Sequence, residues 1–147
     1  MKNTRTVNIL MADDDADDRM LMKEALDINK LSNTIHFVED GEELMHYLYK
    51  EGKFKTQPTF RPGLILLDLN MPKIDGREAL KLIKSDHSLK SIPIVIFTTS
   101  RSETDVTQIY DLGANSFICK PVRFDHLIEM AGQLGNYWFR TVTLPLQ

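Results

Sequence analysis

The sequence predicts an α/β protein in which a five-stranded, doubly wound parallel sheet carries helices on both faces. Five short aliphatic runs alternate along the chain with longer segments whose apolar residues recur at helical spacing. Such alternation favours parallel strands joined by crossover helices. The run over residues 64–67 is apolar at every position, which is typical of a strand that is buried on both faces.

The composition predicts one globular domain spanning residues 1–147. Hydrophobic residues make up 42% and charged residues 27% of the chain, an ordinary balance for a soluble protein. The net charge of −3 gives no general affinity for nucleic acid. The single cysteine, Cys119, leaves no internal disulfide and is compatible with a reducing cytoplasm. The polar N-terminus does not resemble a signal peptide, and no apolar stretch is long enough to span a membrane.

The first strand is predicted over residues 7–12, and a run of acidic residues follows it directly. Asp13 and Asp14 lie at the strand tip, where neighbouring carboxylates repel one another. The later acidic residues are interpreted only as the start of a helix, where negative charge is favourable; they are Asp15, Asp17 and Asp18. The helix is expected to extend to about Ile28, with an apolar stripe formed by Leu21, Ala25 and Ile28 and flanked by Met22 and Leu26.

A second strand is predicted over residues 34–38, and Asp40 then caps a helix with Glu43 three residues later. The apolar face of this helix is formed by Leu44, Tyr47 and Leu48. The polar connection over residues 50–61 is interpreted as a solvated loop, and a partner-binding surface is the alternative. Its cationic side chains are Lys50, Lys53, Lys55 and Arg61.

The central strand is predicted over residues 64–67, and it ends abruptly in Asp68. Pro72 stops the extended segment, because proline has no N–H for the ladder. An isolated aspartate at this place would most simply form a turn, so the case for a ligand site depends on the other strand tips. Asp75 repeats the capping pattern and opens a helix, whose inward residues are Leu80 and Ile83.

The last two strands are predicted over residues 92–97 and 116–119, followed by Thr98 and by Lys120 respectively. A helix from about 102 to 112, ended by Gly113, connects them. The final helix begins near Arg123, and residues 141–147 are expected to be an extended tail. The stripe of the final helix, which Gly132 and Gly135 weaken, is formed by Leu127, Ala131, Leu134 and Trp138.

The polar residues at the strand tips form a chemically coherent set. In a parallel sheet the carboxyl ends of the strands share one edge, where ligands bind. The set contains carboxylates, a hydroxyl and an ammonium: Asp13, Asp14, Asp68, Thr98 and Lys120. Mg²⁺ takes oxygen ligands, often carboxylates together with phosphate oxygens. A carboxylate is also able to accept a phosphoryl group, whose charge the hydroxyl and the ammonium stabilise.

This set of separated motifs, in this order, closely resembles the receiver domain of two-component response regulators. The resemblance covers about residues 7–139 and leaves residues 140–147 as a C-terminal extension. It implies the flavodoxin-like fold with strand order 2-1-3-4-5. It also implies a role for each matching residue: Asp68 as phosphoacceptor, Asp13 and Asp14 with Asp68 and the Asn70 backbone carbonyl as ligands of Mg²⁺ (or Mn²⁺), Thr98 as switch hydroxyl, Lys120 as phosphate-pairing lysine, and Phe117 as switch aromatic. For Phe117 a simple core position is the alternative.

The resemblance further implies a function. A sensor histidine kinase would transfer a phosphoryl group onto Asp68 in a Mg²⁺-dependent reaction, and the changed surface would be read by a downstream protein in the cytoplasm. The chain would catalyse its own phosphorylation and dephosphorylation without being a conventional turnover enzyme. The long loop before the central strand and the ending Tyr137–Arg140 look like stand-alone regulators that partner phytochrome-type kinases. These regulators tend to dimerise, so we expect a homodimer with the final helix and tail in the interface.

Other protein classes fit these residues less well, and each is an alternative. A degenerate receiver that binds partners without phosphorylation is the serious one, and the complete set of site residues argues against it. A phosphatase of the haloacid dehalogenase type needs a second aspartate where this chain has Asn70. A P-loop hydrolase lacks its G-x-x-x-x-G-K-[ST] motif, and a flavodoxin-like cofactor binder would need hydroxyls where the first strand ends in carboxylates. The four histidines have no metal-ligand spacing.

Overall fold

The computed structural model describes residues 7–31 and 33–145 of the chain. Strands and helices alternate throughout this part, as the sequence predicts. In chain order the elements are β1 (Val7–Ala12), α1 (Ala16–Ile28), β2 (Asn33–Val38), α2 (Gly41–Tyr49), the 3₁₀ turn η1 (Gly52–Lys55), β3 (Leu64–Leu67), α3 (Gly76–Ser85), β4 (Ile94–Thr98), α4 (Glu103–Asp111), β5 (Ser116–Cys119), α5 (Phe124–Gly135) and the π-helical turn η2 (Asn136–Thr141).

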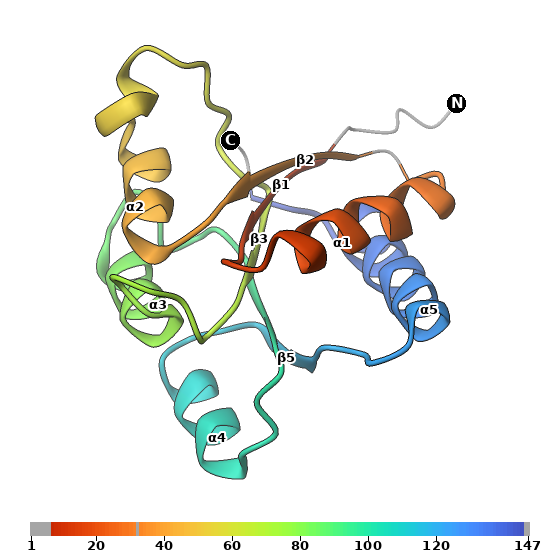
Figure 1. The fold of residues 1–147 in the computed structure, drawn as a ribbon. Helices are drawn as coiled ribbons and strands as arrows, with labels where there is room; N and C mark the ends of the chain where they lie inside the picture. Colours follow the sequence, from red (N-terminus) through yellow and green to blue (C-terminus); the bar gives the residue numbers. More distant parts are fainter. Residues whose placement is uncertain (1–6, 32, 146–147) are drawn as a thin grey trace.

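The five strands form one parallel sheet in the order β2-β1-β3-β4-β5 (Figure 1). The register places Ala12 beside Leu67 and Thr98 beside Cys119, so the strands end close to one another at one edge. Each strand is followed by a helix, and the described helices lie on both sides of the sheet (Figure 1). The predicted doubly wound fold and its strand order are confirmed.

Alternate residues of the strands face two separate hydrophobic cores, as expected for a sheet covered on both sides. The core under α2, α3 and α4 contains the strand residues Leu10, Ile65, Leu67, Ile94 and Ile96. The core under α1 and α5 contains Ile9, Met11, Leu64, Leu66, Val95 and Phe97. All of these strand side chains are buried, and this double burial holds the carboxyl ends of the strands in a fixed position.

The helix starts follow the predicted capping pattern. The Asp40 carboxylate accepts a hydrogen bond from the backbone N–H of Glu43 at 2.8 Å, and the Asp75 carboxylate accepts one from Glu78 at 3.0 Å. Gly113 follows α4 with φ +103°, a conformation that glycine adopts without steric cost. These local signals place the starts of α2 and α3 and the end of α4 correctly.

The packing of α1, and of α5 against the segment that follows α1, corrects two expectations. Ile28, predicted to lie on the buried stripe, is 52% exposed, because the buried stripe of α1 consists of Met22, Ala25 and Leu26. The glycines of α5, expected only to weaken that helix, are contact points for the segment after α1. A Cβ atom on Gly135 would lie 2.1 Å from Leu31 Cδ1, so this position tolerates no side chain without movement.

The chain after α5 stays helical up to the predicted start of the tail, and the backbone is extended at Val142. α5 continues into the turn η2, in which the Thr141 hydroxyl donates to the Asn136 carbonyl at 2.8 Å. Three apolar side chains from this segment pack against the core under α1 and α5: Trp138, Phe139 and Leu144. This part of the chain therefore extends the protomer's own hydrophobic core. Residues 146 and 147 lie outside the described residues.

Candidate functional site

The predicted site residues meet at the carboxyl edge of the sheet, where backbone hydrogen bonds continue past the ends of the strands. Asp68 N–H donates to the Ala12 carbonyl at 3.1 Å, and Lys120 N–H donates to the Thr98 carbonyl at 2.7 Å. These bonds tie the tip of β3 to β1 and the tip of β5 to β4. The functional side chains therefore start from a rigid backbone, which favours a preorganised site.

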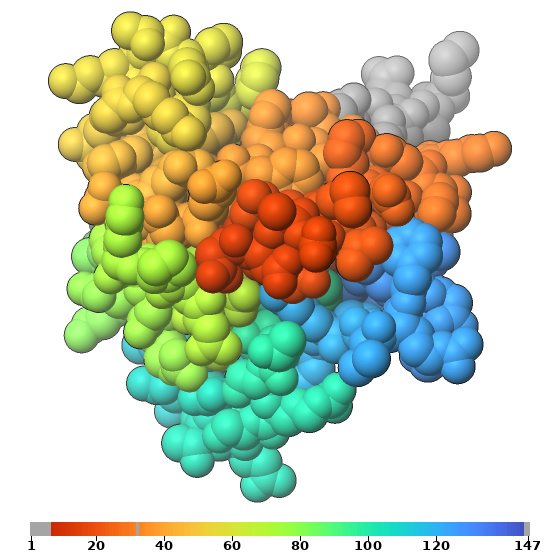
Figure 2. All heavy atoms as spheres, in the orientation of Figure 1, coloured from red at the N-terminus to blue at the C-terminus, as the bar shows by residue number. Residues whose placement is uncertain are grey.

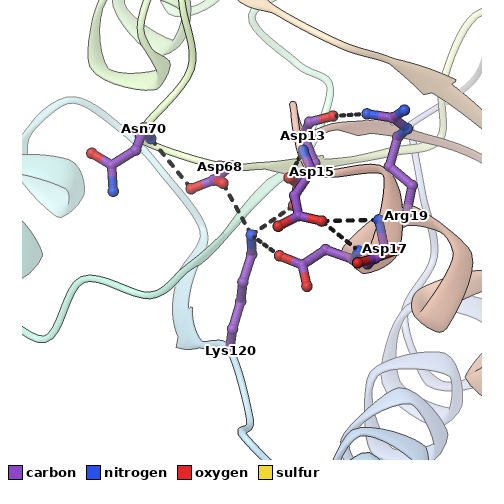
Figure 3. A network of polar contacts seen from close by, with 8 residues as sticks. Asp13, Asp15, Asp17, Arg19, Asp68, Asn70 and Lys120 are labelled. Atoms are coloured by element: carbon purple, nitrogen blue, oxygen red, sulfur yellow. Dashed lines mark hydrogen bonds and ion pairs between the residues drawn. The ribbon is translucent and has the colours of Figure 1, made fainter.

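The Lys120 ammonium lies at the centre of this edge and contacts three carboxylates. Its Nζ is 2.7 Å from Asp13 Oδ2, 2.8 Å from Asp18 Oδ2 and 3.0 Å from Asp68 Oδ2. Only 9% of the Lys120 side chain is exposed. Figure 3 shows the ammonium pointing toward the carboxylates of Asp68 and Asp13, with dashed lines marking the contacts. We call Lys120 with Asp13, Asp18 and Asp68 the lysine cluster.

Burial and close contacts shift the pKa values of Asp13 and Lys120 in the lysine cluster. Asp13 is 1% exposed, and desolvation raises the pKa of its carboxyl to about 6, although the nearby Lys120 ammonium acts in the opposite direction. Burial also acts to lower the pKa of Lys120, but hydrogen bonds to Asp13 and Asp18 outweigh it and raise that pKa above its ordinary value. Lys120 is therefore positively charged at neutral pH, while Asp13 carries its charge at an energetic cost.

Local hydrogen bonds orient the carboxylates. Asp13 Oδ1 accepts the backbone N–H of Asp15 at 2.9 Å, and Asp68 Oδ1 accepts that of Asn70 at 3.2 Å. The guanidinium of Arg19 donates to the Asp13 backbone carbonyl at 2.7 Å (Figure 3). Each buried carboxylate thus has one oxygen held by the backbone and the other close to Lys120.

A divalent cation fits the acidic part of this edge. Carboxylate oxygens of Asp13, Asp14 and Asp68 all lie within 4.8 Å of one another. Asp13 and Asp68 are buried, whereas Asp14 is exposed, so the group opens to solvent on one side. Hard oxygen donors with an open side match Mg²⁺ or Mn²⁺, which keep water or phosphate ligands.

The remaining predicted residues lie at two places. Thr98 ends β4 and is fully buried, and its Oγ1 has no hydrogen-bond partner among the described residues. A buried hydroxyl without a partner is unfavourable, so it is available to an incoming ligand oxygen. Phe117 lies partly buried on β5, packed against the core under α2, α3 and α4, and its backbone N–H donates to the Tyr110 hydroxyl at 3.2 Å. Its switch role stays a prediction.

Asp18 was missed as a site residue. The sequence suggests only that it starts α1, and it does lie in the first turn, where its N–H donates to the N-cap residue Asp15 at 3.2 Å. Its side chain also reaches Lys120, which lies 102 residues later in the chain. No local sequence pattern predicts such a contact. Figure 2 shows the first turn of α1 (red) at the surface, bordering the segment that follows β3 (light green).

Comparisons with known proteins agree with this geometry. Response regulator Rcp1 of Synechocystis is 39% identical over 137 residues, covering 93% of this chain and 92% of the relative. The crystal structure of the phosphorylated cyanobacterial phytochrome response regulator RcpA covers 97% of this chain and all of its own, with a TM-score of 0.88 and 39% identity. The Mn²⁺-bound form of Rcp1 covers 95% of this chain and 99% of its own, with a TM-score of 0.86 and 38% identity.

Residues 9–132 match the family described as response regulator receiver domain. The match covers every strand except the first two residues of β1, and it includes all the strand-tip residues discussed above. None of the helices in the described part of the chain is both long and apolar enough to cross a membrane. The chain belongs to the response regulator receiver domain family and is a response regulator of two-component signalling.

Proposed function

We propose that this protein accepts a phosphoryl group on Asp68 in a Mg²⁺-dependent reaction and thereby switches its surface for a downstream protein. The observation that carries the proposal is the environment of the Asp68 carboxylate. It lies beside the carboxylates of Asp13 and Asp14 and 3.0 Å from the Lys120 ammonium. A metal ion and an ammonium on either side of one carboxylate neutralise the charge of an arriving phosphoryl group.

The proposed reaction transfers the phosphoryl group from a phosphohistidine. An Asp68 oxygen attacks phosphorus, the P–N bond breaks as the P–O bond forms, and the electron pair of the broken bond returns to the imidazole, which ends neutral after proton exchange with water. A divalent cation held by Asp13, Asp14, Asp68 and the Asn70 carbonyl would neutralise the phosphoryl oxygens. Lys120 pairs with these oxygens, and the free hydroxyl of Thr98 donates to one of them.

A small phosphodonor tests the chemistry directly. With Mg²⁺ present, the protein should gain one acid-stable, alkali-labile phosphoryl group, and Asp68→Asn should gain none. Asp111→Asn, which changes an exposed carboxylate on α4, is the control and should behave like the parent. Label on a histidine, or full labelling of Asp68→Asn, would refute the assignment. Complete absence of labelling with intact partner binding would favour the degenerate receiver.

Mg²⁺ binding is testable without phosphorylation. A ligand that binds only the folded protein stabilises it by about 2.7 kcal/mol when its concentration is 100 times the dissociation constant. Mg²⁺ should therefore raise the melting temperature of the parent protein. Asp14→Asn, which changes an exposed member of the acidic group, should remove most of this gain. A melting temperature that Mg²⁺ leaves unchanged in the parent would exclude the metal site.

A phytochrome-type sensor histidine kinase in the cytoplasm is the proposed phosphodonor. The support is the similarity to RcpA, whose structure is titled as a cyanobacterial phytochrome response regulator, and to the bacteriophytochrome response regulator RtBRR at 36% identity. Phosphotransfer from a panel of autophosphorylated kinases is the test. Transfer from phytochrome-type kinases should be the fastest at equal concentrations, and equal rates from unrelated kinases would contradict this partner.

We also propose a homodimer that uses α5 and the residues after it. Trp138, Phe139 and Leu144 pack on the protomer's own core, but Tyr137 remains 52% exposed beside them. An exposed aromatic residue next to an apolar segment favours an interface. Sedimentation should show a dimer for the parent and a monomer for Tyr137→Glu with an unchanged melting temperature. A monomeric parent at high micromolar concentration, with and without phosphorylation, would exclude the dimer.

A further inference from the structure

The lysine cluster contains one carboxylate that the proposed reaction does not use. Asp13 and Asp68 belong to the candidate metal site, but Asp18 is outside it. Asp18 Oδ2 nevertheless accepts a hydrogen bond from Lys120 Nζ at 2.8 Å. Its side chain is 31% exposed, so the contact is reachable from solvent but is not a freely solvated surface pair.

The number of hydrogen-bond donors on the Lys120 ammonium indicates a role for its contact with Asp18. A lysine ammonium has three N–H donors, and here it faces three carboxylate oxygens. A cation bound between Asp13, Asp14 and Asp68 would compete with Lys120 for Asp13 and Asp68. The ammonium would then keep only the Asp18 carboxylate as a full partner, and its other donors would become available to phosphoryl oxygens.

From this arrangement we infer that Asp18 is a positioning residue for Lys120, which retains the ammonium beside Asp68 after the metal has taken the other two carboxylates. This inference rests on the proposed phosphoryl transfer to Asp68. Lys120 has a flexible four-carbon stem, and without an anchor its ammonium would move between many positions. A misplaced charge-stabilising group lowers the rate of a reaction even when the substrate still binds.

The neighbouring Asp17 provides a matched control. It has the same charge and lies in the same first turn of α1 as Asp18. It is exposed, and its backbone N–H, rather than its carboxylate, makes the hydrogen bond to Asp15 at 2.9 Å. Asp17→Ala therefore removes one negative charge near the site without removing the Lys120 contact, whereas Asp18→Ala removes both.

The first measurement follows the Lys120 ammonium by NMR and needs no phosphorylation. In the parent protein and in Asp17→Ala, the ¹⁵N signal of a hydrogen-bonded Lys120 ammonium should be visible without metal and should persist when Mg²⁺ is added. In Asp18→Ala it should be visible without metal, because Asp13 and Asp68 still hold it, and should be lost on adding Mg²⁺. Persistence of the signal in Mg²⁺-saturated Asp18→Ala would overturn the inference.

The second measurement is the rate of phosphorylation with saturating Mg²⁺ and varied phosphodonor. Asp18→Ala should lower the maximal rate by about tenfold, less than the roughly hundredfold loss typical of removing a charge-stabilising donor itself, with little change in the donor concentration at half-maximal rate. Asp18→Asn keeps a hydrogen-bond acceptor and should recover part of the rate. Equal losses in Asp17→Ala and Asp18→Ala would indicate a general charge effect and refute the positioning role. If the parent takes up no phosphoryl group, the proposed function fails, while the NMR measurement still decides whether Asp18 anchors Lys120.

Discussion

The ion pairs at the carboxyl edge of the sheet differ sharply from those on the helix surfaces. In the lysine cluster one ammonium that is 9% exposed contacts three carboxylates within 3.0 Å. On α1 the pair Lys23–Asp27 has nearly the same separation, 3.1 Å, but its side chains are 56% and 66% exposed. Ion pairs with nearly equal N···O distances therefore differ widely in their exposure to solvent.

This comparison shows that burial, rather than distance, decides what an ion pair does. An exposed pair gains little, because water screens its attraction. A buried cluster interacts strongly, but its members have lost their hydration, and the raised pKa of Asp13 records that loss. The excess of negative charge at the sheet edge is a reason for a cation to bind there and a weak reason for the fold to be stable.

The largest expected effect comes from removing the central ammonium. Lys120→Met should lower the free energy of unfolding by about 3–5 kcal/mol in the presence of a chelator, because buried carboxylates lose their counter-charge. Urea unfolding measures this change. Mg²⁺ should restore part of the loss. A loss below about 1 kcal/mol, the range of exposed ion pairs, would show that the lysine cluster is electrostatically no different from the surface.

The pH dependence of stability should follow Asp13. Its folded-state pKa of about 6 lies above the ordinary aspartate value of 3.8, so the folded protein binds this proton more tightly than the unfolded chain. Stability from this group is fully present below about pH 4 and is lost as the pH rises through 6. Without metal, the loss should be on the order of 2–3 kcal/mol.

Asp13→Asn isolates that contribution. The variant should be more stable than the parent near neutral pH in chelator, and its stability should change less between about pH 4 and pH 7. Urea unfolding across this range is the measurement. Parallel stability curves for the parent and the variant would mean that burial does not raise the pKa of Asp13. The contrast between buried and exposed ion pairs would then lose its main support.

An intermediate effect is expected for the partly buried pair Arg77–Asp105, which joins α3 to α4 at 2.8 Å. The hydrogen bond from the Ser100 hydroxyl lowers the pKa of Asp105, and the hydrogen bond from Arg77 lowers it further. A double-mutant cycle with Arg77→Ala and Asp105→Ala should give a coupling free energy between those of the lysine cluster and the exposed pairs. A coupling equal to either extreme would remove the proposed dependence on burial.

The smallest effect is expected for the exposed pair on α1. The double-mutant cycle with Lys23→Ala and Asp27→Ala should give a coupling free energy of about 0.3–0.5 kcal/mol, which added salt should reduce. Thermal or urea unfolding at two salt concentrations measures it. A coupling that exceeds that of Arg77–Asp105 would reverse the order on which the comparison depends.

Most of the site residues that sequence reasoning identified share one property: each lies at or next to the carboxyl end of a strand. Asp13, Asp68, Thr98 and Lys120 lie at the carboxyl ends of predicted strands, and parallel strands bring these ends together at one edge of the sheet. Asp18 lacks that property. Its position in the first turn of α1 has a sufficient local explanation, which concealed the contact with Lys120. Because the start of α1 already accounts for Asp18, no sequence pattern indicates a second role for this residue.

The sequence by itself determined the order of the elements, the doubly buried central strand, the helix caps and the polar strand tips, because each depends on a few neighbouring residues. The tertiary structure alone decided three other features: which side of α1 is buried, why α5 carries Gly135 opposite Leu31, and where the residues after α5 pack. It also decided that one ammonium contacts three carboxylates, which lie just after β1, in α1 and just after β3. Such features depend on contacts between residues distant in the chain, whose distances no local pattern specifies.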